Sequence, residues 1–274
     1  MKIKYYKLII SATIFISSFF VWYILSISSS SGKLEIYFLK LNRGHAVFIR
    51  TPKNENILIN GGQNSEIIKE LTRILPFYER RIDILIMTSA EHRNVGGLVD
   101  IIKRYEVKKI IEPILLATST ALYVFEDVLR NKNISVEKVG KGDTFFTKEF
   151  KFHVLFPDLD FKYNKTSRKE MVLLMEYGST TMLLLGNVSK TIQKSFITEP
   201  LFHSTKIDIV EYDHSAINSN TSEELFSKLN PEYVIIRRNL KSKANSFLIE
   251  GKIEGEMNTK ILNLEKEGTV RLSF

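Results

Sequence analysis

Acidic and imidazole side chains occur next to each other at a few points of the chain. Glu91 precedes His92, Asp213 precedes His214, and His45 follows a glycine. Carboxylates and imidazoles are the usual ligands of zinc and manganese, and a bound metal can activate water for hydrolysis. These residues define a candidate metal site, provided that folding brings distant loops together.

The segment around Glu91 has the order expected of a site-bearing loop. The apolar run 82–87 predicts a strand buried on both faces, and the polar stretch 88–94 predicts a loop after it. Gly96 and Gly97 follow, which favours a helix packed closely on that strand. Because α/β folds place their chemistry at the carboxyl ends of strands, this loop is the first place to look for a site.

The remaining chain alternates between strand-like and helix-like patterns. Strands are predicted at 34–41, 46–51, 56–60, 108–112, 134–139, 150–156, 171–177, 181–185, 207–212, 233–237, 260–264 and 270–274. Helices are predicted at 65–75, 95–105, 118–131 and after a capping sequence at 221–224. Strands that return after a first set of strands and helices favour a four-layer αββα sandwich with two related halves.

The amino terminus predicts a membrane anchor. Residues 8–27 are uncharged and mostly apolar, and as a helix they would span about 30 Å, the thickness of the hydrocarbon core of a bilayer. Lys2, Lys4 and Lys7 precede this run, so the amino terminus is expected in the cytoplasm and the rest of the chain outside it. A cleaved signal peptide is the competing interpretation, but the run is longer than its usual apolar region. We therefore expect a tip, anchor and tether at 1–32 and one domain at 33–274.

Composition excludes some chemistry and leaves nucleic-acid binding open. The chain has no cysteine, which excludes disulfides, thiolate metal sites and a cysteine nucleophile. Its net charge is +8 at pH 7, and a cluster of cations near residue 240 could contact phosphates. A solvated basic surface explains the same charges. The candidate phosphate-binding residues are Arg93, Arg237, Arg238, Lys241 and Lys243.

Several loops carry the frame of a known motif. Thr88, Gly96 and Gly97 fit the pattern Thr-His-x-Asp-x-Asp-His-x-Gly-Gly. Residues 40–46 keep one glycine and the alanine of Asp-Val-Gly-Gln-Gly-Asp-Ala, and residues 58–62 match Leu-Ile-Asp-Gly-Gly except at Asn60. In this respect the chain resembles the metallo-β-lactamase-fold domain at the carboxyl end of ComEC proteins, which function in DNA uptake. The resemblance covers about three quarters of the chain and implies a metallo-β-lactamase-like αββα fold.

The residues that hold metal in that family are mostly replaced here. Asn60 and Asn187 stand where the family has aspartate, Ser89 and Asn94 where it has histidine, and Arg93 where it has a ligand aspartate. Glu91 and His214 are the matched positions that keep a possible ligand type. The resemblance therefore implies a degenerate site, composed of Asn60, Ser89, Glu91, Arg93, Asn94, Asn187 and His214.

Different functions follow from these patterns. The first is a catalytically inactive, membrane-anchored relative that binds DNA or a membrane-protein partner and needs no cofactor. The second is an active metal-dependent hydrolase or nuclease that uses zinc or manganese in a rearranged site formed by His45, Glu91, His92, Asp213 and His214. A purely structural exported module is the third. A serine nucleophile, Ser89 or Ser215 with His214, lacks nucleophile-elbow spacing.

Arg93 has two interpretations. Its planar fork of donors suits a phosphate, and with neutral Ser89, Asn94 and Asn187 the former cation pocket could accept an anion. Alternatively, Arg93 pairs with Glu91 or points into solvent.

Overall fold

The structure is a computed structural model, and it describes residues 2–27, 32–114, 119–130, 132–158, 170–213, 223–237 and 259–274. His214, Ser215, Arg238, Lys241 and Lys243 lie outside the described residues, so the predictions made for them stay predictions.

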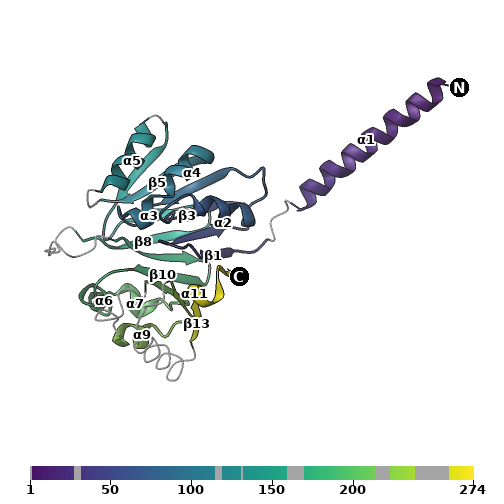
Figure 1. Cartoon of the computed structure of the whole chain (residues 1–274). Helices are drawn as coiled ribbons and strands as arrows, with labels where there is room; N and C mark the ends of the chain where they lie inside the picture. Colours follow the sequence, from purple (N-terminus) through teal and green to yellow (C-terminus); the bar gives the residue numbers. More distant parts are fainter. Residues whose placement is uncertain are drawn as a thin grey trace.

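The first sheet has seven strands in the order β14-β1-β2-β3-β4-β5-β6 (Figure 1). Its strands are β1 (Glu35–Leu39), β2 (Ala46–Arg50), β3 (Asn56–Ile59), β4 (Arg81–Ile86), β5 (Glu106–Pro113), β6 (Ser135–Val139) and β14 (Val270–Ser273). β3 to β6 are parallel, whereas β1 and β2 form the predicted hairpin. The carboxyl ends of β3 and β4 therefore meet at one edge.

The second sheet also has seven strands, in the order β13-β12-β11-β10-β9-β8-β7. Its strands are β7 (Thr144–Phe146), β8 (Lys151–Phe156), β9 (Val172–Tyr177), β10 (Thr180–Gly186), β11 (Ile209–Tyr212), β12 (Tyr233–Ile236) and β13 (Lys260–Asn263). β10 to β13 are parallel, like the central strands of the first sheet.

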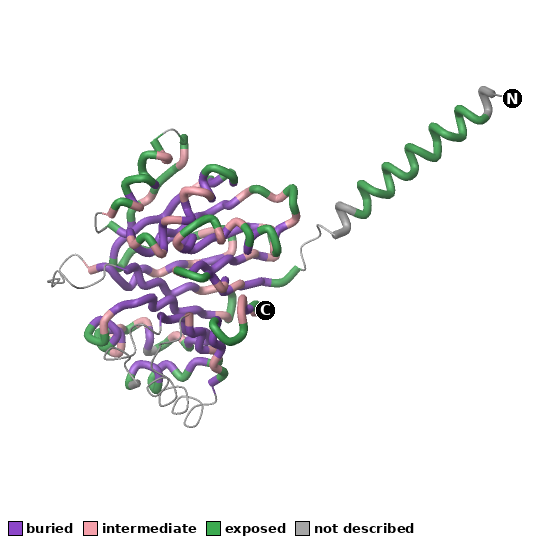
Figure 2. Tube along the Cα trace, viewed as in Figure 1, coloured by how far each residue is buried: buried purple, intermediate pink, exposed green. Residues whose placement is uncertain are grey.

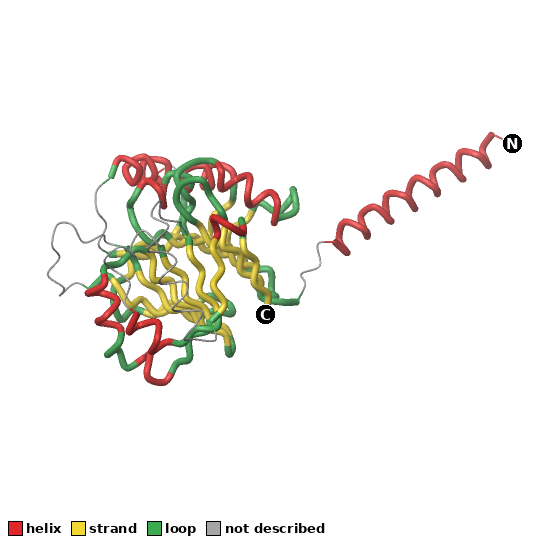
Figure 3. Tube along the Cα trace, turned by 60° about the horizontal axis from the view of Figure 1, so that its bottom comes forward, coloured by secondary structure: helices red, strands yellow, loops and turns green. Residues whose placement is uncertain are grey.

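Three apolar clusters hold the layers together. One lies between the sheets and joins alternate strand residues such as Ile86 and Ile209. A second joins the outer face of the first sheet to its helices, through Leu71 and Phe125 for example. The third does the same for the second sheet. Figure 3 shows strands between two groups of helices, so the predicted four-layer αββα sandwich is confirmed.

Helices cover both outer faces. The first sheet is covered by α2 (Glu66–Ile74), α3 (His92–Val95), α4 (Leu98–Arg104) and α5 (Thr120–Arg130), and the second by α6 (Lys190–Phe196), α7 (Leu201–Ser204) and α9 (Glu223–Leu229). The short α11 (Leu264–Glu267) joins β13 to β14.

The amino-terminal helix α1 (Lys2–Ile27) is long and apolar enough over Tyr5–Tyr23, 19 residues, to cross a membrane. Its described side chains are exposed along the helix (Figure 2). Length and composition thus meet the requirement for a span.

The structure differs from the prediction at a few elements. The expected loop 88–94 is shorter, because α3 begins at His92, and the expected helix 95–105 is divided between α3 and α4 at Gly96 and Gly97. A Cβ at Gly97 would lie 2.0 Å from the carbonyl oxygen of Gly61, so the close approach at this glycine is to the loop after β3 and not to the strand 82–87 for which it was predicted. The short elements β7, α6, α7 and α11 were not predicted, since so few residues carry little periodic signal.

Candidate functional site

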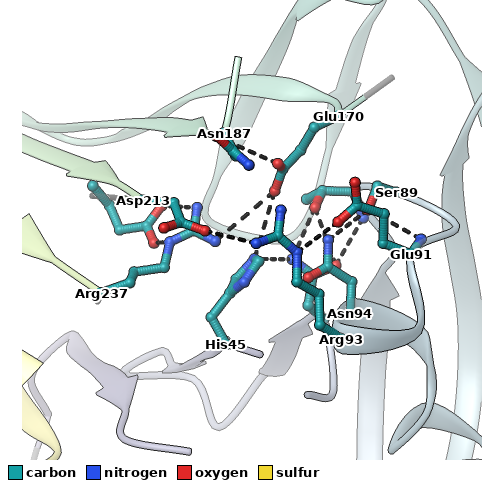
Figure 4. A network of polar contacts seen from close by, with 12 residues as sticks. His45, Ser89, Glu91, Arg93, Asn94, Glu170, Asn187, Asp213 and Arg237 are labelled. Carbon is teal, nitrogen blue, oxygen red and sulfur yellow. Dashed lines mark hydrogen bonds and ion pairs between the residues drawn. The ribbon is translucent and has the colours of Figure 1, made fainter. Parts of the chain in front are cut away.

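The candidate site lies where parallel strands of both sheets end. Thr88 to Asn94 follow β4, while Asn187, Asp213 and Arg237 come directly after β10, β11 and β12. Backbone hydrogen bonds fix this register, from Asp213 N to Gly186 O at 3.1 Å and from Arg237 N to Tyr212 O at 3.3 Å. Glu170 lies just before β9, and the backbone N of the next residue, Met171, donates to Thr88 O at 2.7 Å. The two sheets thus meet at one polar cluster (Figure 4).

Asn60 supports the loop after β4. It has a left-handed backbone, with φ of 60°, which asparagine tolerates better than most residues. Its Oδ1 accepts from Thr88 N at 2.9 Å, and its Nδ2 donates to His45 Nε2 at 2.8 Å. The amide therefore keeps the positioning role that the resemblance assigns to an aspartate, and it brings no charge.

Two positions that the resemblance expects to be histidine ligands now bond each other. The side-chain amide of Asn94 donates to Ser89 Oγ at 2.5 Å, and both side chains are buried. The carbonyl oxygen of Asn94 also accepts from Gly61 N at 2.8 Å, which holds α3 against the loop after β3. A hydrogen bond between two neutral side chains therefore lies where the resemblance expects two metal ligands.

Arg93 joins the two halves of the fold. Its Nε donates to Glu91 Oε2 at 2.5 Å, and its Nη1 donates to Asp213 Oδ2 at 3.0 Å. The Arg93 side chain is 19% exposed and that of Asp213 is 5% exposed. Of the two interpretations of Arg93, the structure has the pairing with Glu91, extended to a carboxylate of the second sheet.

A second arginine lies deeper in the site. The Arg237 side chain, 6% exposed, bonds to Glu211 through Nε and donates from Nη2 to Glu211 Oε2 at 2.6 Å. Its Nη1 lies 3.9 Å from Glu170 Oε1, and His45 Nε2 lies 3.7 Å from the same oxygen. Glu170 in turn accepts from Asn187 N at 2.8 Å. Buried carboxylates therefore hold this arginine, and little of its side chain is exposed to a phosphate in solvent.

Burial and neighbouring charges set the protonation of the cluster. Burial, reinforced by Arg237 and Arg93, holds the pKa of His45 well below its ordinary 6.5, so the ring is neutral at pH 7. Burial raises the pKa of Glu170, against the opposing effect of the two arginines. Burial lowers the pKa of Arg237 to about 9, which leaves its guanidinium protonated at neutral pH. Burial lowers the pKa of Arg93, but the negative charges of Glu170, Asp213 and Glu91 outweigh this effect, so the pKa is raised.

The donor set does not fit the metal ions that the fold family suggests. The nearby carboxylates of Glu91 and Asp213 are bonded to Arg93, and that of Glu211 is bonded to Arg237. Two guanidiniums therefore already supply the positive charge that metal ions would bring. Within the described residues, no three His, Asp or Glu side chains are grouped so that they could hold a metal.

The structure brings some of the predicted site residues together and separates others. His45, Asn60, Ser89, Glu91, Arg93, Asn94, Asn187 and Asp213 lie in one cluster. His92 is exposed and lines a separate cavity with Lys103 and Thr120, on the helical side of the first sheet. The rearranged metal site as predicted is therefore not assembled from its described members.

Sequence reasoning missed Glu170 and Glu211. Both carboxylates are buried, one just before β9 and one inside β11. A charged residue within an otherwise apolar strand requires a buried partner, and Arg237 after the next strand was the available cation. That rule could have linked Glu211 to Arg237.

A polar pocket of about 220 Å³ opens above the cluster. It is lined by Leu41, Asn42, Arg43, Gly44, His45, Gln63, Arg93, Asp213, Arg237 and Glu265. Gly44 approaches Arg93 so closely that a Cβ there would lie 1.8 Å from the Arg93 carbonyl oxygen. The β1–β2 turn therefore forms one wall of the pocket, with Arg43 exposed at its mouth.

A known protein sequence matches most of the chain. ComE operon protein 3 of Bacillus subtilis (strain 168) is 24% identical over 247 residues, which cover 84% of this chain. The chain spans only 31% of the length of that relative. No family model matches the chain.

Solved structures show the same architecture. The metallo-β-lactamase fold protein YhfI from Bacillus subtilis covers 88% of this chain and 100% of its own, with a TM-score of 0.62 and 9% identity. Tm1679, a metal-dependent hydrolase of the β-lactamase superfamily, covers 87% and 98%, with a TM-score of 0.60 and 12% identity. Zn²⁺-bound PqqB from Methylobacterium extorquens covers 84% and 87%, with a TM-score of 0.53 and 12% identity.

Similar folds thus include metal-dependent hydrolases and a zinc-bound protein. The architecture and these matches confirm the fold that the motifs predicted. The chain has the metallo-β-lactamase fold and is related in sequence to ComE operon protein 3.

Proposed function

We propose that this chain is a membrane-anchored, catalytically inactive metallo-β-lactamase-fold protein that acts by binding. The observation that carries the proposal is the pair of guanidiniums at the site. Arg93 bridges Glu91 and Asp213, and Arg237 bonds Glu211 beside Glu170. A hydrolytic metal needs free carboxylate or imidazole ligands and an open coordination position. Here the arginines use the carboxylates instead.

Charge balance supports the same proposal. A guanidinium carries one positive charge, so a site that uses two of them in place of two dications needs fewer negative ligands. Asn60 and Asn187 are neutral where the resemblance expects aspartates. The side chain of Asn60 donates to His45 Nε2, and the backbone N of Asn187 donates to Glu170. The replacements are therefore consistent with one another, as expected of a site that has been rebuilt around arginine.

For the location of the domain, we propose a single-pass anchor formed by α1. The lysines at positions 2, 4 and 7 favour a cytoplasmic amino terminus, which would place the two-sheet domain outside the cytoplasm. Protection of this domain from protease added outside intact cells would contradict the orientation.

For the ligand, we propose the phosphates of DNA, as the resemblance to the domain of the DNA-uptake protein ComEC implies. Arg43 at the mouth of the pocket is exposed, with Gln63 as a neighbouring hydrogen-bond donor. Arg93 is held by two carboxylates, so it contributes positive charge more than a free fork of donors. Direct contact with phosphate is therefore assigned first to Arg43.

The test compares DNA binding by the full chain in nanodiscs across a series of salt concentrations. Arg43→Ala is expected to weaken binding and to reduce the salt slope by about one, the value for one lost phosphate contact. Arg130→Ala is the matched control and should behave as the wild type. Arg130 ends α5, is not among the residues that line the pocket, and has a side chain that is 64% exposed.

Equal affinities and equal salt slopes in the wild type and both variants would show that the pocket does not bind DNA. A protein partner would then be the remaining candidate ligand. Zinc- or manganese-dependent cleavage of DNA by the wild type would contradict inactivity and support the alternative function, a metal-dependent nuclease.

A further inference from the structure

The edge of the fold opposite the candidate site has a different surface. We name it the tether edge, and it is the edge at which β1, β3, β4, β5 and β6 begin. Antiparallel pairing of β1 with β2, and parallel pairing from β3 to β6, place all these starts on one side. The chain arrives here from α1, and the carboxyl terminus lies here too, since Phe274 pairs with Leu34 (Figure 1).

The short connection keeps this edge close to the anchor. Between the end of α1 at Ile27 and the start of β1 at Glu35, the chain can reach at most about 28 Å, at about 3.5 Å per residue. A compact domain of this size has a diameter of about 45 Å. If α1 spans a membrane, the tether edge is therefore nearer to the bilayer than the site edge.

Aromatic side chains gather at the tether edge. Outside α1, the exposed aromatic residues of the described chain are Phe77, Tyr78, Tyr123, Phe146 and Phe274. All but Tyr123 belong to this edge. Phe77 and Tyr78 are in the loop that enters β4, Phe146 ends β7, and Phe274 follows β14. Exposed rings concentrated on one edge mark an interaction surface.

The loop before β4 is built to present its rings outward. Phe77 is 79% exposed and Tyr78 is 43% exposed, and their ring centroids lie 5.3 Å apart in an edge contact. Arg80 Nε donates to Phe77 O at 3.3 Å, and its guanidinium lies 5.6 Å from the ring centroid of Tyr105. With strands spaced about 4.8 Å apart, this loop lies about 15 Å along the edge from β1.

Cations accompany the rings. The β2–β3 turn and the β7–β8 turn lie side by side, because Lys53 N donates to Glu149 at 3.2 Å and Lys148 N donates to Glu55 at 3.3 Å. Lys53, Lys148 and Lys33 are exposed there. Acidic Glu79 and Glu106 lie at the same edge, and Lys53 Nζ is 4.0 Å from Glu149 Oε1, so the rings are expected to contribute more than the charges.

We propose that the tether edge rests on the bilayer, with Phe77 and Tyr78 at the boundary between headgroups and acyl chains and the lysines facing anionic phospholipid headgroups. Aromatic rings with flanking lysines are the side chains that favour this boundary. The inference rests on the proposed anchoring by α1. It points the candidate site away from the membrane, toward the aqueous compartment.

The test uses the full chain reconstituted into phospholipid vesicles with brominated acyl chains, which quench nearby indoles. Trp22 in α1 is the single tryptophan of the wild type, and its quenching reports anchoring. In a Trp22→Phe background, Phe77→Trp reports the tether edge, and Tyr123→Trp on α5, where the native side chain is 62% exposed, is the matched control.

We expect the indole at position 77 to be blue-shifted and quenched, more strongly in vesicles that contain anionic lipid, and the indole at position 123 to be neither. Quenching of Trp22 together with equal, water-like emission from positions 77 and 123 would overturn the docking inference while leaving the anchor intact. An unquenched Trp22 would contradict the anchor and the docking inference together.

Discussion

Arg93 and Arg237 perform related tasks at different depths. Arg93 lies at the rim, where its side chain is 19% exposed and one partner, Glu91, is 37% exposed. Arg237, directly after β12, is more deeply buried, and its partners Glu211 and Glu170 are 1% and 3% exposed. When an ion pair at the rim breaks, water can solvate both charges. A buried charge that loses its partner has no such solvation.

This difference suggests separate roles for the two cations. Arg237 compensates carboxylates that have no access to solvent, so it is expected to matter mainly for stability. Both arginines line the pocket, but Arg93 has the more exposed side chain and connects the loop after β4 to Asp213 of the other sheet, so it is expected to matter for both stability and binding.

The largest expected effect comes from Arg237→Met. This change leaves Glu211 buried without its bonded cation and removes one of the two arginines that act on Glu170, so we expect the free energy of unfolding to fall by about 3–5 kcal/mol in denaturant titrations. The double variant Arg237→Met with Glu211→Gln removes one of the stranded charges and should recover part of the loss. A single variant as stable as the wild type would show that Arg237 does not compensate these carboxylates.

Arg93→Met should cost less, about 1–3 kcal/mol, because water can solvate Glu91 while Asp213 loses a bonded cation. A double-mutant cycle with Asp213→Asn measures the direct coupling of the pair. Additive losses would mean that Arg93 and Asp213 stabilise the fold independently. Arg93 would then not act through its ion pair, in contrast to the role assigned to Arg237.

The pH dependence of stability tests the buried imidazole. His45 has a folded pKa well below 6.5, so the unfolded state binds more protons as the pH falls below about 6.5. Its contribution lowers stability at acid pH, by at most about 1.4 kcal/mol per pH unit. The raised pKa of Glu170 acts in the opposite direction, because the folded state then binds the extra proton.

His45→Gln separates these two contributions. Unfolding curves at pH 7.5 and 5.5 should show a smaller loss of stability on acidification in this variant than in the wild type. The same loss in both proteins would assign the pH dependence to other groups.

The sequence allowed much of the fold to be predicted, because its long apolar strands and paired glycines carry strong local signals. Strand 82–87 is an example and is present as Arg81–Ile86, whereas the close approach expected of Gly97 is present but to Gly61. The pairing of charges was less accessible. Arg237 and Glu211 are separated by 26 residues, and only the parallel pairing of β11 with β12 brings them together.

The site also shows why motif replacement alone was ambiguous. Arg93 beside Glu91 suggested either an anion pocket or a local ion pair, and the deciding partner, Asp213, lies 120 residues away in the other sheet. Glu170 gave no motif signal at all, since it stands outside the pattern of the related family.

The central claim is that arginine guanidiniums take the place of metal ions in this site. Elemental analysis of the purified full chain, after expression in medium supplemented with zinc and manganese, tests it most directly. We expect no stoichiometric amount of either metal after gel filtration. One or two metal ions per chain that stay bound would contradict it.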